Sequence, residues 1–303
     1  SLDSLEPLAQ LRTLRLHGSI STYDHGSMDH IAWRMNNIAG STSALAQLSH
    51  LTSLTLASAG YTSPGNEVYN ASAAVGNRVR GELPLWMLRD SERLAVDVDG
   101  NDITLPHDIG DLHTSSLSTV DVGAWGLNGT LPSSLGMLTT LRRLNLSMSN
   151  FSGSIDPLST LAQLTSLDVS GLDGHWYHGQ NNLTGELPLW MLRNNRTGGM
   201  KLALHEDGGD DNHISLPHDI GLLNGTAIKD ELDLSDQGLG GSLPASFSNL
   251  TSLRRLNLAE NQFSGSISPL STLVQLSSVD LASNQFHSSI NLLATLTQLT
   301  SLD

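Results

Sequence analysis

The sequence contains no cysteine in its 303 residues. Disulfide bonds, thiolate metal sites and cysteine nucleophiles are therefore excluded. The absence does not indicate a reducing compartment, because a long repeat protein does not need the cross-links on which small secreted domains depend. Aromatic residues make up only 4% of the chain, so its core must be built mainly from aliphatic side chains.

Basic residues and long apolar runs are also scarce. Lys and Arg number 15 against 30 Asp and Glu, which gives a formal net charge of -15. Nucleic acid and anionic membranes are poor partners for such a chain, because phosphate binding requires clustered positive charge. No apolar run approaches the roughly 18 residues of a membrane span, and residues 1–25 do not resemble a signal peptide. We predict no membrane insertion.

The motifs of common enzymes are missing as well. The sequence has no GxSxG elbow, no His and Asp placed around a particular Ser, and no glycine-rich phosphate loop. We therefore predict a protein without catalytic residues.

What the sequence has in abundance is a repeat. Residues 253–267, LRRLNLAENQFSGSI, follow the pattern LxxLxLxxNxFSGxI, and the pattern returns 23 residues later. Side chains alternate across a strand, so the two apolar residues of LxL face one side and the residue between them faces the other. One such strand cannot bury its apolar side alone, whereas stacked copies form a parallel sheet over a continuous core.

Strand centres of the LxL kind can be placed along the whole chain. They fall at residues 14/16, 54/56, 96/98, 120/122, 144/146, 167/169, 202/204, 232/234, 256/258 and 279/281, and an eleventh begins at 302. Several neighbours are 23 or 24 residues apart, and the longer intervals contain polar insertions at 21–35, 61–76, 173–180 and 205–211. Such insertions are typical of surface loops on a fixed scaffold.

A longer period lies over the short one. GELPLWMLR begins at 81 and 185, LPHDIG at 105 and 216, and LRRLNL at 141 and 253. The last offset is 112 residues, which spans four repeats. We predict a single continuous solenoid over residues 1–303, in which a four-repeat block has been duplicated.

These motifs closely resemble the plant-type leucine-rich repeats of receptor-kinase ectodomains and polygalacturonase inhibitors. The resemblance covers essentially all 303 residues. It implies an α/β repeat fold: a right-handed solenoid of about 11 repeats, with a parallel concave β-sheet, a second short sheet near the Gly-x-Leu-Pro turn, and ligand contact on the concave side. The cysteine-bearing caps of that family are missing.

A structural Asn is expected at the bend after each LxL strand, where its amide can bond unpaired backbone groups. This Asn ladder comprises Asn36, Asn77, Asn101, Asn181, Asn212, Asn261 and Asn284, while Trp125, Ser149 and Gln237 occupy the position in three repeats.

Eight N-x-Ser/Thr sequons indicate N-linked glycans and hence secretion to the cell surface or extracellular space. They are Asn70, Asn128, Asn145, Asn150, Asn182, Asn195, Asn224 and Asn249. The alternative is polar turn chemistry alone. Asn145 lies within an LxL strand, where a glycan would obstruct the concave face for a protein ligand.

The outward residue of each LxL strand is most often acidic. We expect a concave binding face formed by Asp97, Asp121, Asp168, Asp233 and Asp280 together with Arg143 and Arg255. Calcium or a basic ligand could relieve repulsion on neighbouring strands; the simpler interpretation is a solvated acidic face. DVDGND (97–102) superficially resembles a calcium loop but lacks its full spacing. HEDGGDDNH (205–213) could bring two imidazoles and several carboxylates around a metal, or form an ordinary solvated loop. His107 and His218 are interpreted as turn residues. We predict no metal site and no cofactor besides glycans.

Two functions are compatible with these features. Solenoids require polar caps at their ends, and neither end of this sequence has one. We therefore expect a non-enzymatic structural glycoprotein that self-associates end to end into a surface or matrix fibre. The alternative is a recognition ectodomain that binds a protein, peptide or glycan through the concave face and the insertions.

Overall fold

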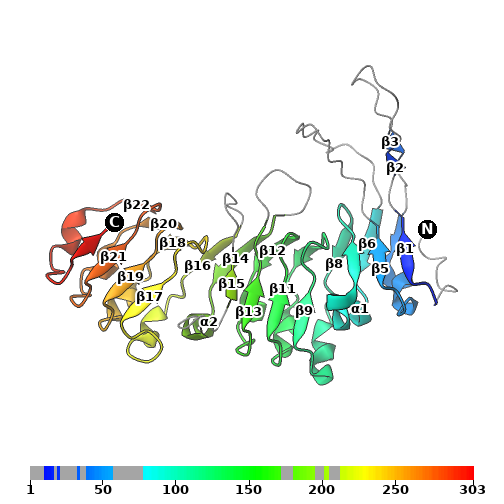
Figure 1. Cartoon of the computed structure of the whole chain (residues 1–303), viewed down its shortest axis with the longest axis horizontal. Coiled ribbons are helices and arrows are strands. Elements are labelled where there is room, and N and C mark those ends of the chain that lie inside the picture. The colour runs from blue at the N-terminus through cyan, green and yellow to red at the C-terminus, as the bar shows by residue number, and fades with distance from the viewer. Residues whose placement is uncertain are drawn as a thin grey trace, which may run out of the picture.

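A computed structural model describes residues 10–16, 19–20, 33–34, 39–56, 78–171, 180–194, 201–204 and 212–303. These residues form one elongated coil whose turns stack from the N-terminal end, blue in Figure 1, to the C-terminal end, red. Two series of parallel strands form two sides of the coil, and short helical segments form most of the remainder.

All eleven strand centres expected from the sequence form strands, here called the LxL strands. They are β1 (Thr13–Arg15), β5 (Ser53–Thr55), β7 (Ala95–Asp97), β9 (Thr119–Asp121), β11 (Arg143–Asn145), β13 (Ser166–Asp168), β15 (Lys201–Ala203), β17 (Glu231–Asp233), β19 (Arg255–Asn257), β21 (Ser278–Asp280) and β23 (Ser301–Leu302). Paired strands are in register at their central apolar residues, as Leu144 with Leu167. The predicted leucine-rich-repeat solenoid is confirmed.

The second series of strands forms a flank sheet beside the LxL strands. It comprises β4 (Ala39–Ser41), β6 (Arg78–Glu82), β8 (Asp102–Thr104), β10 (Asn128–Thr130), β12 (Asn150–Ser154), β14 (Asn182–Glu186), β16 (His213–Ser215), β18 (Gly240–Ser242), β20 (Gln262–Gly265) and β22 (Gln285–Phe286). Its strands follow the chain order without interruption. The resemblance implied a secondary, short sheet here, yet this 10-stranded sheet is the longest in the described part of the chain.

The LxL strands, by contrast, form three separate ladders: β1 to β7, β9 to β15, and β17 to β23. At the first break the Asp121 N–H donates to the Ser91 hydroxyl (3.0 Å), so a side chain takes the place of a neighbouring strand. At the second break the intervening segment makes a tight turn, closed by a hydrogen bond from Gly225 N–H to the Ile228 carbonyl (2.8 Å). The predicted parallel strands are therefore present, and they pair in three sections.

Helical segments close the coil opposite the LxL strands. The duplicated PLWML motif forms α1 (Leu85–Arg89) and α2 (Leu189–Asn194). Turns of 3-10 helix cover Thr42–Gln47, Ser91–Arg93, Ile109–Ser115, Ser133–Met137, Asp156–Leu158, Ile220–Leu223, Ala245–Asn249, Ser268–Leu270 and Ile290–Leu293. The indoles of Trp86 and Trp190 are partly buried and donate to the Leu45 and Ser159 carbonyls of the preceding coil, so both rings join neighbouring turns.

A short antiparallel pair, β2 (Ser19–Ile20) and β3 (Trp33–Arg34), stands where the first insertion leaves and rejoins the coil. It is the one antiparallel pairing among the strands that the structure describes.

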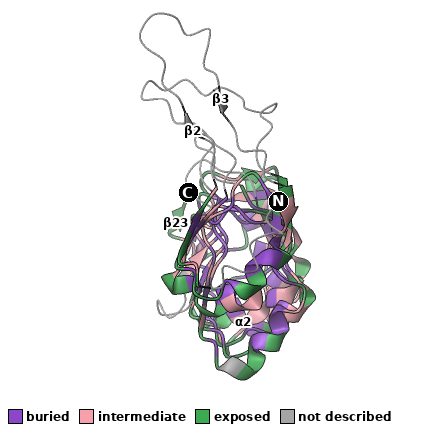
Figure 2. Cartoon of the chain, turned by 90° about the vertical axis from the view of Figure 1, so that its right-hand side faces the viewer, coloured by how far each residue is buried: buried purple, intermediate pink, exposed green. Residues whose placement is uncertain are grey.

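The core runs through the interior of the coil, where buried residues line the inner sides of the LxL strands and of the flank sheet, here called the two walls (Figure 2). Leucine dominates it, with Phe151, Phe247 and Phe263 fully buried among the aliphatic side chains. The rings of Phe263 and Phe286 stack with centroids 6.1 Å apart. Each turn therefore buries its apolar side against its neighbours, as a stacked repeat requires.

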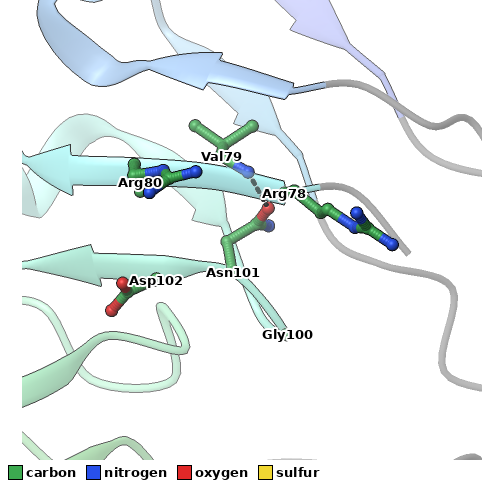
Figure 3. A pocket seen from close by; sticks show the side chains of 6 residues that line it. All are labelled: Arg78, Val79, Arg80, Gly100, Asn101 and Asp102. Atoms are coloured by element: carbon green, nitrogen blue, oxygen red, sulfur yellow. Dashed lines mark hydrogen bonds between the residues drawn. The ribbon is translucent and has the colours of Figure 1, made fainter. Parts of the chain in front are cut away.

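The Asn at the bend joins the two walls. Figure 3 shows Asn101 between β6 and β8, with its Oδ1 atom accepting from the Val79 N–H at 3.1 Å. Its Nδ2 atom donates to the carbonyls of Leu56 and Val98, both at 2.9 Å. Asn181, Asn212, Asn261 and Asn284 likewise donate to LxL-strand carbonyls and accept from a flank-strand N–H or its neighbour. Asn36 and Asn77 lie outside the described residues.

Candidate binding face

The outward residues of the LxL strands form a polar surface, here called the LxL face. Paired positions on β9, β11 and β13 place Asp121, Asn145 and Asp168 side by side. The same Asp, Asn, Asp order recurs on β17, β19 and β21 as Asp233, Asn257 and Asp280. An amide therefore separates the carboxylates, which lie about 9.6 Å apart because adjacent strands are spaced about 4.8 Å.

The Asp and Asn side chains of the LxL face also hold the backbone in place, a role that the sequence did not indicate. The Oδ1 atom of Asp168 accepts from the Ser170 N–H at 3.1 Å and from its hydroxyl at 2.6 Å. Asn145 does the same with Ser147, at 3.0 and 2.7 Å. The corresponding bond to the N–H two residues on is made by Asp97, Asp121, Asp233, Asn257 and Asp280. Asp and Asn both supply this oxygen, which explains why either can stand here.

The other carboxylate oxygen remains available. Those of Asp121, Asp168, Asp233 and Asp280 make no hydrogen bond to any residue that the structure describes. In each of these carboxylates on the LxL face, one oxygen is thus held by a backbone hydrogen bond, and the other can bind a ligand.

The two arginines expected on this face are already paired. Arg143 bonds Glu92 and also donates to Thr119, while Arg255 donates to Glu231 at 2.9 Å. This bond raises the pKa of Arg255 through the hydrogen bond to Glu231 and through the attraction of its charge. Both guanidinium groups are exposed, so these ion pairs can exchange partners with a ligand.

The sequons occupy different environments. Asn150, Asn182 and Asn249 are exposed and start or end a flank strand or helical turn. Asn128 donates through Nδ2 to the Asn101 carbonyl at 2.8 Å, and Asn224 donates through Nδ2 to Thr251 at 3.3 Å. A glycan replaces one hydrogen of that nitrogen, so the first three positions accommodate it with the least rearrangement. Asn70 and Asn195 lie outside the described residues.

The two segments that were considered as metal sites, 97–102 and 205–213, differ in how far the structure describes them. In DVDGND, Asp97 and Asp99 accept backbone N–H groups and Asn101 belongs to the bend, so the segment is a repeat turn. Most of the loop 205–213 lies outside the described residues. A cluster that the sequence did not single out brings Glu82, His107 and Asp108 together.

Two hollows lie beside the flank sheet among the residues that the structure describes. One, of about 330 Å³, is lined by Arg78, Val79, Arg80, Gly100, Asn101 and Asp102 (Figure 3). The other, of about 450 Å³, is lined in part by Glu186, Trp190, Arg193 and Asp219. Both are wide open, which suits contact with a macromolecular surface better than enclosure of a small molecule.

Comparison with known proteins agrees with the fold. The Leucine Rich Repeat family matches residues 252–273. Receptor-like protein 39 of Arabidopsis thaliana is 32% identical over 166 residues, which are 54% of this chain and 17% of that protein. Receptor-like protein 41 of the same plant is 29% identical over 153 residues, 50% of this chain and 16% of that protein. The chain therefore spans less than a fifth of these relatives.

Solved structures also match along the chain. A TDR receptor is 23% identical, with a TM-score of 0.37, over 97% of this chain and 47% of that one. The complex of PEPR1 with AtPEP1 is 24% identical, with a TM-score of 0.38, over 88% of this chain and 40% of that one.

The repeat pattern and the two parallel sheets show a leucine-rich-repeat solenoid, and part of its sequence is similar to that of the two Arabidopsis receptor-like proteins. In the part of the chain that the structure describes, no helix has the length and hydrophobicity to cross a bilayer.

Proposed function

We propose that this chain is an extracellular recognition module that binds a protein or peptide through the LxL face and performs no catalysis. The observation that carries the proposal is the pair of Asp-Asn-Asp rows, each held by backbone hydrogen bonds and each leaving carboxylate oxygens toward solvent. Fixed charges of one sign favour a ligand segment of the opposite sign at little cost in entropy.

The ligand segment is therefore basic and extended. Arg or Lys side chains bind the free oxygens of Asp121 and Asp168 in one row, and of Asp233 and Asp280 in the other. The net charge of -15 attracts such a ligand over longer distances.

The relatives favour recognition over the fibre that the sequence alone suggested. Receptor-like protein 39 carries the word receptor in its name, and it is similar to this chain over 166 residues. The fibre hypothesis depended on the lack of polar caps at the two ends of the sequence. That lack does not show whether capping segments adjoin the chain. The similarity to receptor-like proteins and the exposed sequons at Asn150, Asn182 and Asn249 support an extracellular location.

Selection of a random-peptide display library against the glycosylated chain tests the proposal. We expect enrichment of peptides with several Lys or Arg residues that bind competitively with one another at the LxL face. Enrichment of peptides without basic residues, or of peptides that bind only the flank sheet, would overturn it.

A further inference from the structure

A histidine and two carboxylates from successive coils meet beside the flank sheet. Glu82 ends β6, and His107 and Asp108 form the turn after β8, one coil further on. The His107 Nδ1 atom lies 2.7 Å from the Glu82 Oε2 atom. One ligand atom from each of the three residues lies within 4.8 Å of the other two.

The backbone that carries these side chains is fixed on both sides. The Glu82 carbonyl accepts from the Thr42 hydroxyl of the preceding coil at 2.6 Å. The His107 carbonyl accepts from the Ser134 hydroxyl of the following coil at 2.6 Å. Four successive turns thus hold the two chain segments at a constant separation, while the side chains themselves remain free to adjust.

The Asp108 carbonyl accepts from the Asp111 N–H, but its side chain makes no hydrogen bond to any residue that the structure describes. It precedes the 3-10 turn Ile109–Ser115, yet its side chain makes no capping hydrogen bond to that turn. It is half-buried beside the Glu82 and His107 pair. An Asp before a helical turn usually caps it, so a carboxylate left out of this role is available as a ligand.

We propose that Glu82, His107 and Asp108 bind a divalent transition-metal ion of the zinc class. An imidazole nitrogen with two carboxylates suits zinc, copper or nickel, whereas calcium and magnesium prefer sites built of oxygen alone. Zinc takes imidazole and carboxylate ligands at about 2.0–2.2 Å, so the two bonded atoms must separate by roughly 0.6 Å to admit it. The exposed side chains of His107 and Glu82, 80% and 41% accessible, permit that movement.

The bound ion joins two successive turns, because Glu82 and His107 are 25 residues apart. A ligand that binds the folded state alone stabilises it by an amount that rises with the logarithm of the ligand concentration above its dissociation constant. The site therefore acts as a clip within the solenoid. Its exposed position also leaves coordination sites for water or for a donor group of a partner.

The duplicated block supplies a natural control. Glu186 and His218 repeat the pair at 2.7 Å, and the Ser246 hydroxyl repeats the bond to the His218 carbonyl at 2.6 Å. The carboxylate of Asp219 does not complete a three-residue cluster there, since among the described residues that arrangement occurs at Glu82 alone. The second pair is expected to bind zinc more weakly.

Calorimetric titration of the folded chain with zinc chloride tests the proposal. Glu82→Gln and His107→Ala should each remove one binding event, and Asp108→Asn should weaken that event at least about tenfold. His218→Ala is the matched control and should leave the tighter event intact. Imidazole is a common zinc ligand and the chain has 12 histidines, so the comparison between variants, rather than the total stoichiometry, decides.

A second measurement keeps the test independent of folding defects. Zinc should raise the melting temperature of the wild-type chain and of His218→Ala, and the rise should shrink in Glu82→Gln; calcium at the same concentration should not reproduce it. Identical isotherms and identical melting shifts for wild type and Glu82→Gln would overturn the site.

Discussion

Asp121 and Asn145 are direct partners on neighbouring strands, and each uses its Oδ1 atom to accept the backbone N–H two residues further along the chain. The shared atom explains how acidic and neutral residues alternate along one face without a change of backbone. It also separates the structural role of this position from its charge, because Asn satisfies the first and removes the second.

Because Asp and Asn supply the same acceptor oxygen, two substitutions of Asp168 should differ in their effect on the free energy of unfolding. Asp168→Asn keeps the acceptor for the Ser170 N–H and hydroxyl and should change the free energy of unfolding by no more than about 0.5 kcal/mol. Asp168→Ala removes both bonds and should cost about 1–2 kcal/mol. Urea denaturation followed by circular dichroism measures both; equal losses would contradict the assigned role.

The bend Asn is predicted to matter most. Asn261 is 7% exposed, donates to the Leu234, Leu258 and Ala259 carbonyls, and accepts from two N–H groups. Asn261→Ala should destabilise the chain by about 3–5 kcal/mol, since several buried backbone groups lose their partner. Exposed Asn249→Ala is the control, measured on unglycosylated protein, and a comparable loss there would argue against the ladder.

Gln237 stands at the bend position that Asn occupies in most other repeats, and a substitution to Asn should restore the missing hydrogen bond. It occupies the bend position, but its Oε1 atom is buried and has no hydrogen-bond partner among the described residues. Gln237→Asn should place the acceptor where the other repeats have it and raise the free energy of unfolding by about 1 kcal/mol. No gain in the urea midpoint would show that the longer side chain is accommodated in another way.

The Glu186 and His218 pair predicts a pH dependence. The hydrogen bond to Glu186 and its charge raise the pKa of His218 above 6.5, while hydrogen bonds from the His218 backbone and ring lower the pKa of Glu186 below 4.5. The contribution of His218 is complete below pH 6.5 and is lost as the pH rises through its raised pKa. That of Glu186 is present above pH 4.5 and is lost as the pH falls through its lowered pKa.

Proton NMR titration of the imidazole measures this coupling. In Glu186→Gln the pKa of His218 should fall toward 6.5, and His287, far along the chain, serves as the reference signal. An unchanged pKa would show that the pair does not form in solution.

Glycan occupancy is predicted to be selective. In protein secreted from a eukaryotic host, Asn150, Asn182 and Asn249 should be occupied, and Asn128 should be largely unmodified because its Nδ2 atom bonds the Asn101 carbonyl. Mass spectrometry of glycopeptides before and after enzymatic deglycosylation reads each position separately. Full occupancy of Asn128 would contradict this ranking.

The sequence predicted those features that a single repeat determines. LxL spacing places the strands, because alternation alone sorts Leu144 inward and Asn145 outward. The bend amide follows from the same register, as Asn101 shows. Contacts between coils were harder to predict from the sequence. The Ser91 hydroxyl accepts from the Asp121 N–H, 30 residues away in the sequence, at the break in the LxL strands, and nothing in the local sequence of Ser91 indicates this bond.

The Glu82 and His107 contact was missed for the same reason. Each residue lies in its own motif, GELP or LPHDIG, and the two meet only when coils stack in register. One signal was present: both motifs were duplicated together, at 81 and 105 and again at 185 and 216, which is expected when they form one unit.

The most direct test of recognition through the LxL face compares two fourfold variants that carry the same net charge. The first, Asp121→Asn, Asp168→Asn, Asp233→Asn and Asp280→Asn, removes the carboxylate charges of the two Asp-Asn-Asp rows and keeps their backbone bonds. The second, Asp90→Asn, Asp102→Asn, Asp111→Asn and Asp156→Asn, removes four exposed charges elsewhere.

Binding of a basic peptide selected on the wild-type chain is measured for both variants by calorimetry. We expect at least about tenfold weaker binding to the first variant, because each of the four exposed ion pairs contributes a modest energy, and a much smaller change in the second. Equal weakening in both would mean that net charge alone attracts the peptide, and unchanged binding to the first would contradict recognition through this face.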